Sequence, residues 1–135
     1  QLMPNQSLHF ELGRSVVAQC GTLIAQVLYV KQTPTKQFVI LDAGMTELIR
    51  PALYQAKHKI TNTTSSSPII ERYDVVGPIC ESSDVFAQDI LLPTTKRGDI
   101  IAIHSAGAYG ESMASTYNCR PLPPTYTNDQ IAIRD

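Results

Sequence analysis

One loop of the sequence places a thiol beside a carboxylate among turn-forming residues. Positions 77–84 read Gly-Pro-Ile-Cys-Glu-Ser-Ser-Asp and follow an apolar stretch. A thiol in the right position can donate a proton to a carbanion. Free cysteines are more often small, inert core residues. The polar surroundings of Cys80 and Glu81 favour a reaction site, and Asp84 closes the same segment as a turn or interface residue.

A second loop carries a tyrosine bracketed by glycines. Positions 105–110 read Ser-Ala-Gly-Ala-Tyr-Gly and also follow an apolar stretch. Glycines let backbone N–H groups approach a phosphate closely. Tyr109 could therefore contact a phosphate-bearing cofactor, or it could be a barrel aromatic whose hydroxyl reaches solvent.

Two arginine motifs complete the candidates. Glu11-Leu12-Gly13-Arg14 ends an expected strand, but so short a motif alone fits a surface Glu–Arg pair better. Positions 49–54 read Ile-Arg-Pro-Ala-Leu-Tyr. Arg50 and Tyr54 are four apart, so a helical turn puts both on one side, as a carboxylate-binding pair would need. Alternatively, Arg50 extends over a half-buried Tyr54 and has only a structural role.

The elements that position these residues are mostly short strands. We expect a mainly β domain, a Greek-key-like β-barrel or sandwich, because turn residues interrupt apolar runs throughout. Strands are expected at 22–32, 38–42, 69–76, 85–92 and 99–104, with a final hairpin at 125–134. Helical turns are expected within 47–53, where Pro51 should interrupt the turn, and within 110–114.

The start of the chain does not fit an independent β domain. Residues 8–11 alternate like a strand, and Ser15 could cap a short helix over 15–20 that Gly21 would end. A strand, a glycine turn and a helix form a βα unit, which has no counterpart in the rest of the sequence.

Composition excludes several classes of function. The 135 residues carry a net charge of −1, which gives no basic surface for nucleic acid or an anionic membrane. No apolar stretch reaches the roughly 20 residues of a membrane-spanning helix. Three cysteines without metal-ligand spacing indicate a reducing cytoplasm, and Cys20 and Cys119 are interpreted as structural. His9, His58 and His104 lie apart, so no metal site is expected.

The four motifs occur in an order that resembles the C-terminal part of the diaminopimelate decarboxylases. These belong to the pyridoxal-phosphate-dependent ornithine, diaminopimelate and arginine decarboxylases. The resemblance spans nearly the whole chain. It departs from the family pattern at Leu12, where the family has proline, so the stiffness of that turn is in question.

The resemblance implies a role for each motif. Glu11 would pair with the protonated pyridine nitrogen, and Gly13, the Arg14 backbone and Tyr109 would contact the cofactor phosphate. The substrate would contact Arg14, Arg50, Tyr54, Glu81 and Tyr109. Cys80 would protonate the substrate Cα after CO₂ leaves, and Glu81 would hold the distal ammonium. In this family the Cys80 loop enters the partner subunit's site, which implies a homodimer with shared active sites.

The resemblance also implies that the chain is part of a larger enzyme. Residues 1–20 would be the last βα unit of a cofactor-binding (β/α)8 barrel, and residues 21–135 the C-terminal β domain. The lysine that holds pyridoxal phosphate as a Schiff base would belong to the upstream barrel. All five lysines here lie in polar segments, so the chain alone should be inactive.

The activity expected of the full-length enzyme is decarboxylation of meso-2,6-diaminopimelate to L-lysine and CO₂. An ornithine, arginine or carboxynorspermidine decarboxylase is the alternative within the family. A non-catalytic β-barrel that binds a partner is the alternative outside it.

Overall fold

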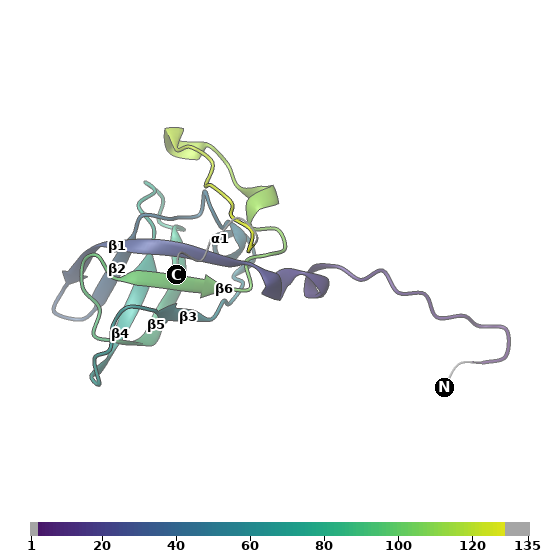
Figure 1. The fold of residues 1–135 in the computed structure, drawn as a ribbon, viewed down its shortest axis with the longest axis horizontal. Coiled ribbons are helices and arrows are strands. Elements are labelled where there is room, and N and C mark those ends of the chain that lie inside the picture. The colour runs from purple at the N-terminus through teal and green to yellow at the C-terminus, as the bar shows by residue number, and fades with distance from the viewer. Residues whose placement is uncertain (1–2, 129–135) are drawn as a thin grey trace.

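Six strands form a nearly closed, barrel-like sheet (Figure 1). The structure, a computed structural model, describes residues 3–128. The strands are β1 (Thr22–Gln32), β2 (Gln37–Leu41), β3 (Ile60–Asn62), β4 (Ile70–Val76), β5 (Val85–Pro93) and β6 (Ile100–His104). The helical elements are α1 (Arg50–Tyr54) and the 3-10 turns η1 (Arg14–Val16), η2 (Ala18–Cys20), η3 (Glu111–Met113) and η4 (Tyr117–Cys119).

The strand order is β3-β6-β1-β2-β4-β5, and every pair except β2–β4 is antiparallel. Side chains at the end of β3 and just after it bind residues just after β5, at the two ends of the sheet. The Asn62 amide donates to the Thr95 hydroxyl at 3.1 Å, and the Ser65 hydroxyl donates to the Thr94 carbonyl at 2.8 Å. The strand order and these contacts confirm the expected mainly β, barrel-like fold.

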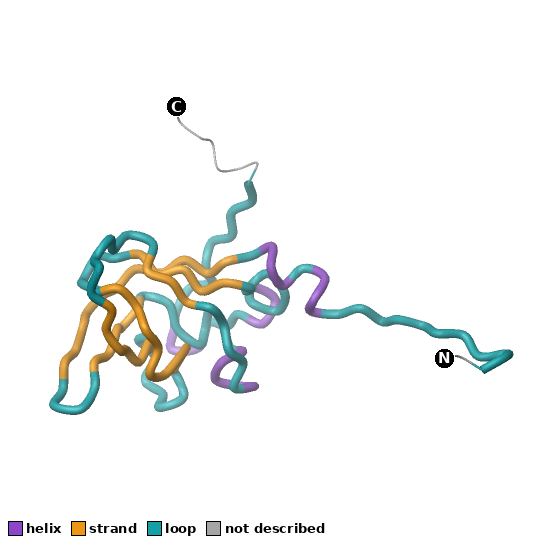
Figure 2. The backbone as a smooth tube through the Cα atoms, turned by 90° about the horizontal axis from the view of Figure 1, so that it is seen from below, coloured by secondary structure: helices purple, strands orange, loops and turns teal. Residues whose placement is uncertain are grey.

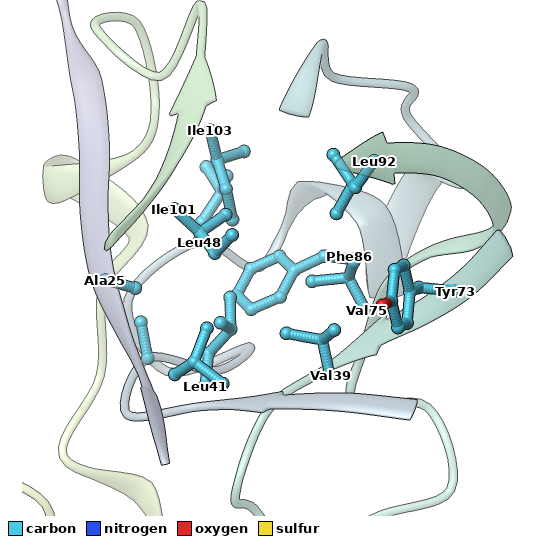
Figure 3. Close-up of a cluster of buried hydrophobic side chains, with 12 residues drawn as sticks. Ala25, Val39, Leu41, Leu48, Tyr73, Val75, Phe86, Leu92, Ile101 and Ile103 are labelled. Atoms are coloured by element: carbon cyan, nitrogen blue, oxygen red, sulfur yellow. The ribbon is translucent and has the colours of Figure 1, made fainter. Parts of the chain in front are cut away.

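The strands alternate buried and exposed residues, and the buried ones meet in a single core (Figure 3). Ala25 and Val27 point inward from β1, while Ile24 and Leu28 stay exposed. Tyr73 is buried too, and its hydroxyl accepts a hydrogen bond from the Thr95 N–H at 3.1 Å. Burial of each large apolar side chain contributes about 1.5–3 kcal/mol.

The expected strand at residues 8–11 does not form. Residues 6–13 run extended and largely exposed, away from the sheet (Figure 2). A strand needs a neighbour for its backbone N–H and C=O groups, and these residues have no strand partner within the described chain. The expected helix at 15–20 is instead the two turns η1 and η2, which Ser15 does not cap.

The helical turn near Pro51 is also placed differently from the prediction. Pro51 lies in the first turn of α1 and does not interrupt it, because proline is tolerated there. The helix ends at Gln55, whose φ of 54° is left-handed. The expected turn at 110–114 is present as η3. The expected hairpin at 125–134 extends beyond the described residues, and 125–128 contain no strand. Between residues 3 and 128, no helix has the length and hydrophobicity needed to span a membrane.

Candidate functional site

The guanidinium group of Arg14 is fixed against the end of β6. Its Nη2 donates to the carbonyl oxygen of Ser105 at 2.7 Å. Ser105 has a left-handed φ of 60°, which is uncommon for a residue other than glycine. The backbone therefore turns sharply after β6, and this turn holds Arg14 beside the loop that carries Tyr109.

Arg50 and Tyr54 lie on one side of α1, as their spacing predicts. The Arg50 Cζ atom lies 5.4 Å from the centroid of the Tyr54 ring, a cation–π contact. Tyr54 is exposed, whereas the Nε atom of Arg50 is buried and has no hydrogen-bond partner among residues 3–128. The Nε atom of Arg14 is also buried and has no hydrogen-bond partner among these residues.

His58 lies close enough to these two arginines to feel their charge, although the sequence analysis considered it only as a metal ligand. Its Nδ1 lies 2.9 Å from the carbonyl oxygen of His104. Burial lowers the pKa of His58, the hydrogen bond to His104 opposes this, and the charges of Arg14 and Arg50 lower it further. Both guanidinium groups thus act on the ring. We call Arg14, Arg50 and His58 the arginine cluster.

The buried carboxylate of Asp84 fixes the loop that carries Cys80 and Glu81. Asp84 accepts hydrogen bonds from the backbone N–H of Met45 at 2.6 Å and of Ile79 at 2.7 Å. Burial raises the pKa of Asp84, while these two bonds oppose the rise. Asp84 was expected to close the turn, and it also ties the loop to the segment after β2. Cys80 and Glu81 themselves are exposed above this anchor.

The segment after η3 reaches the same loop through residues that the sequence did not single out. The Tyr117 hydroxyl donates to a carboxylate oxygen of Glu81, and this bond is the main cause of a raised Tyr117 pKa. Arg120 pairs with Glu47 at 3.2 Å and also donates to the Asp42 carbonyl. These contacts hold η4 over the Cys80 loop.

The remaining predicted site residues stand apart. Glu11 and Gly13 are exposed in the N-terminal segment, and Tyr109 is 47% exposed with a left-handed φ of 62°. The thiols of Cys20, Cys80 and Cys119 are free and exposed.

The candidate residues therefore form two groups. Within residues 3–128, no hydrogen bond or ion pair connects Cys80 or Glu81 with Arg14 or Arg50. The group of Arg14 and Arg50 offers cations that could bind a carboxylate. The group of Cys80 and Glu81 offers a thiol that could donate a proton and a carboxylate that could bind an ammonium.

Comparisons with family models, known sequences and solved structures all point to one family. Residues 15–107 match the family model described as the pyridoxal-dependent decarboxylase, C-terminal sheet domain. A diaminopimelate decarboxylase of Bacteroides thetaiotaomicron is 68% identical over 131 residues, which are 97% of this chain and 34% of that protein. The chain thus spans only about a third of the length of this curated relative.

Solved structures share the fold. Diaminopimelate decarboxylase from Helicobacter pylori, complexed with L-lysine, is 58% identical with a TM-score of 0.77, over 82% of this chain and 27% of that one. Lysine/ornithine decarboxylase from Vibrio vulnificus, complexed with cadaverine, is 26% identical with a TM-score of 0.75, over 84% of this chain and 31% of that one.

Proposed function

Since the chain belongs to the pyridoxal-dependent decarboxylases, as their C-terminal sheet domain, we propose that it serves a diaminopimelate decarboxylase. The complete enzyme converts meso-2,6-diaminopimelate to L-lysine and CO₂ in lysine biosynthesis. The support is the 68% identity to the Bacteroides protein, against 26% to the lysine/ornithine decarboxylase.

The arginine cluster is the observation that carries the choice of substrate. Diaminopimelate keeps a second carboxylate after the first leaves as CO₂, whereas lysine and ornithine have none to keep. Arg14 and Arg50 present buried Nε–H donors without acceptors among the described residues. Guanidinium groups bind carboxylates through such donors. In our proposal they hold the retained carboxylate together with Tyr54.

The residues present fit pyridoxal phosphate as the cofactor. A Cβ built at Gly13 would meet nothing within 4 Å, so the backbone there is open to a phosphate. Glu11 offers a carboxylate for the pyridine nitrogen, and the exposed Tyr109 offers a hydroxyl. When bound, the cofactor withdraws electrons from the bond to the departing carboxylate.

In this proposal the Cys80 loop supplies the groups that act on the rest of the substrate. Cys80 holds the proton that the substrate Cα receives after CO₂ leaves. Glu81, oriented by Tyr117, accepts hydrogen bonds from the distal ammonium. Asp84 keeps the loop in place through its two backbone hydrogen bonds.

We further propose a homodimer in which each active site takes the arginine cluster from one chain and the Cys80 loop from the other. Within residues 3–128 no hydrogen bond or ion pair connects the two groups, as this arrangement requires. In the proposed complete enzyme, the (β/α)8 barrel with the cofactor-holding lysine completes the site. Residues 1–20 would contribute its last βα unit, although residues 8–20 form neither a strand nor an α-helix here. The three free cysteines suit the cytoplasm.

Reconstitution tests the proposal. The chain is mixed with the separately expressed N-terminal portion of the Bacteroides relative, pyridoxal phosphate and meso-diaminopimelate, and L-lysine is measured. We expect lysine to form, and Cys80→Ala to lower the rate by about 10²–10⁴-fold, the usual contribution of a placed proton donor.

Cys20→Ser is the matched control, because it changes another exposed thiol but keeps a donor for the Val17 carbonyl. It should leave the rate unchanged. A well-folded pair that forms no lysine would contradict the proposal and favour a non-catalytic binding module. Formation of a diamine from ornithine or lysine, with none of the expected product, would favour the other decarboxylases.

A further inference from the structure

The arginine cluster contains three buried polar atoms without a hydrogen-bond partner among the described residues. They are the Nε atoms of Arg14 and Arg50 and the Nε2 atom of His58. Buried polar atoms in folded proteins are nearly always hydrogen-bonded. The two arginine Nε atoms are donors, whereas Nε2 of His58 donates only when it is protonated. Together these atoms indicate a binding site for an anionic ligand.

The hydrogen bond to the His104 carbonyl fixes where the imidazole of His58 carries its proton. A carbonyl oxygen can only accept, so Nδ1, at 2.9 Å, must donate. In the neutral ring Nε2 therefore has a lone pair and no proton. The next carbonyl along the chain, that of Ser105, holds Arg14. Arg14 and His58 are thus anchored to the carbonyls of two adjacent residues.

Burial is the main cause of the lowered pKa of His58, and the hydrogen bond to the His104 carbonyl opposes it. Within residues 3–128 the charged groups that act on the ring are Arg14 from η1 and Arg50 from α1, and both lower its pKa, as does burial. A carboxylate bound between the two arginines would reverse this effect. It would offset the cationic charges and offer an acceptor to a protonated Nε2.

We propose that His58 is a third ligand of the carboxylate held by Arg14 and Arg50, and that Nε2 takes up a proton as the carboxylate binds. The proton comes from the solvent, and no covalent bond between heavy atoms forms or breaks. The inference rests on the proposed function, because it takes the retained carboxylate of diaminopimelate as the ligand. That group is the α-carboxylate of L-lysine.

Nuclear magnetic resonance of the histidine rings tests this in the reconstituted pair, with isotope-labelled histidines only in the 135-residue chain. The pH is titrated with and without saturating L-lysine, and His9, exposed in the N-terminal segment, is the internal reference. We expect L-lysine to raise the pKa of His58 by about one unit or more and to leave His9 unchanged. Cadaverine, which has no carboxylate, should shift neither.

Binding measurements supply an independent readout. If one proton is taken up, the Kd of L-lysine should fall by up to about tenfold for each unit that the pH drops between the free and bound pKa values. His58→Gln, which keeps a polar group near the Nε2 position but cannot titrate, should abolish this dependence. His58→Asn, which keeps only a donor near Nδ1, should weaken binding by about tenfold or more at low pH.

Native signals from core methyl groups show that each variant is folded. An unchanged His58 pKa in the presence of L-lysine would overturn the inference, as would an equal response to cadaverine. The proposed function is judged separately, by lysine formation in the reconstituted pair. An active pair with an unresponsive His58 overturns only the inference. An inactive pair in which L-lysine protonates His58 overturns only the proposed activity.

Discussion

At the scale of single residues, the hydrogen bond between Tyr117 and Glu81 predicts a selective loss of substrate binding. Tyr117→Phe removes the hydroxyl that orients the Glu81 carboxylate and keeps the ring. An exposed hydrogen bond contributes only modestly, so KM for diaminopimelate should rise about 2–10-fold, with kcat nearly constant. Steady-state kinetics of the reconstituted pair measure both, and Tyr126→Phe, at another exposed phenol, is the control. A fall in kcat at constant KM would contradict a binding role.

The same scale shows which site residues a sequence can predict. The predicted placement of Arg50 and Tyr54 on one side of a helical turn is confirmed, because a four-residue spacing is a local property of helices. His58 and Tyr117 were missed because their partners lie 46 and 36 residues away in the sequence. Only the closure of the sheet brings such residues together.

At the scale of elements, Gly77 is required by the close approach of the Cys80 loop to the segment after β2. A Cβ at this position would clash with the Asp84 carboxylate and lie 2.5 Å from the Gly44 Cα. Gly77→Ala should therefore lower the free energy of unfolding by about 1–3 kcal/mol. Gly13→Ala should change it far less, since nothing lies within 4 Å there. Urea unfolding compares the two variants, and equal stability would contradict the tight packing.

Asp84 makes the stability of the chain depend on pH. Burial raises its folded-state pKa, so the folded state binds more protons than the unfolded state just above the ordinary pKa of aspartate. Its contribution to stability is full below that ordinary pKa and is lost as pH rises through the raised value. Asp84→Asn removes this loss of stability with pH. It also places an amide donor against a backbone N–H, which lowers the free energy of unfolding by about 1–3 kcal/mol.

The variant should therefore be less stable than the wild type in acid, and the gap should narrow as pH rises. Urea unfolding of both proteins between about pH 3 and pH 7 measures the gap and cancels the contributions of other carboxylates. A gap that stays constant, or widens with pH, would contradict a raised pKa at Asp84.

Strands were predicted correctly where a hydrophobic pattern in the sequence also has a neighbouring strand to pair with. The strand at 22–32 has the predicted bounds because a long run of Leu, Ile, Val and Tyr also finds β2 and β6 as neighbours. Residues 8–11 have the alternation but no neighbour, so the predicted strand is absent. The order of the strands and the parallel β2–β4 pair depend on long-range contacts, which periodicity does not encode.

At the scale of the whole molecule, the nearly closed sheet leaves apolar side chains on its outer surface. On β1, Ile24 is 58% exposed and Leu28 is 42% exposed, and they point away from the core on the same face. Soluble monomers seldom expose large apolar patches, which usually mark an interface. A domain that packs against a barrel and a second subunit would need such a surface. The isolated chain should therefore associate with itself.

Sedimentation velocity over a range of concentrations measures this association. The double variant Ile24→Thr and Leu28→Thr should shift the chain toward monomer, because it removes apolar surface without adding charge. Its urea midpoint should stay nearly unchanged, since threonine suits strands and neither side chain is buried. Ile69→Thr with Ile70→Thr removes two other exposed isoleucines, at the start of β4, and is the matched control. If the two pairs act equally, association is nonspecific and β1 does not form the interface.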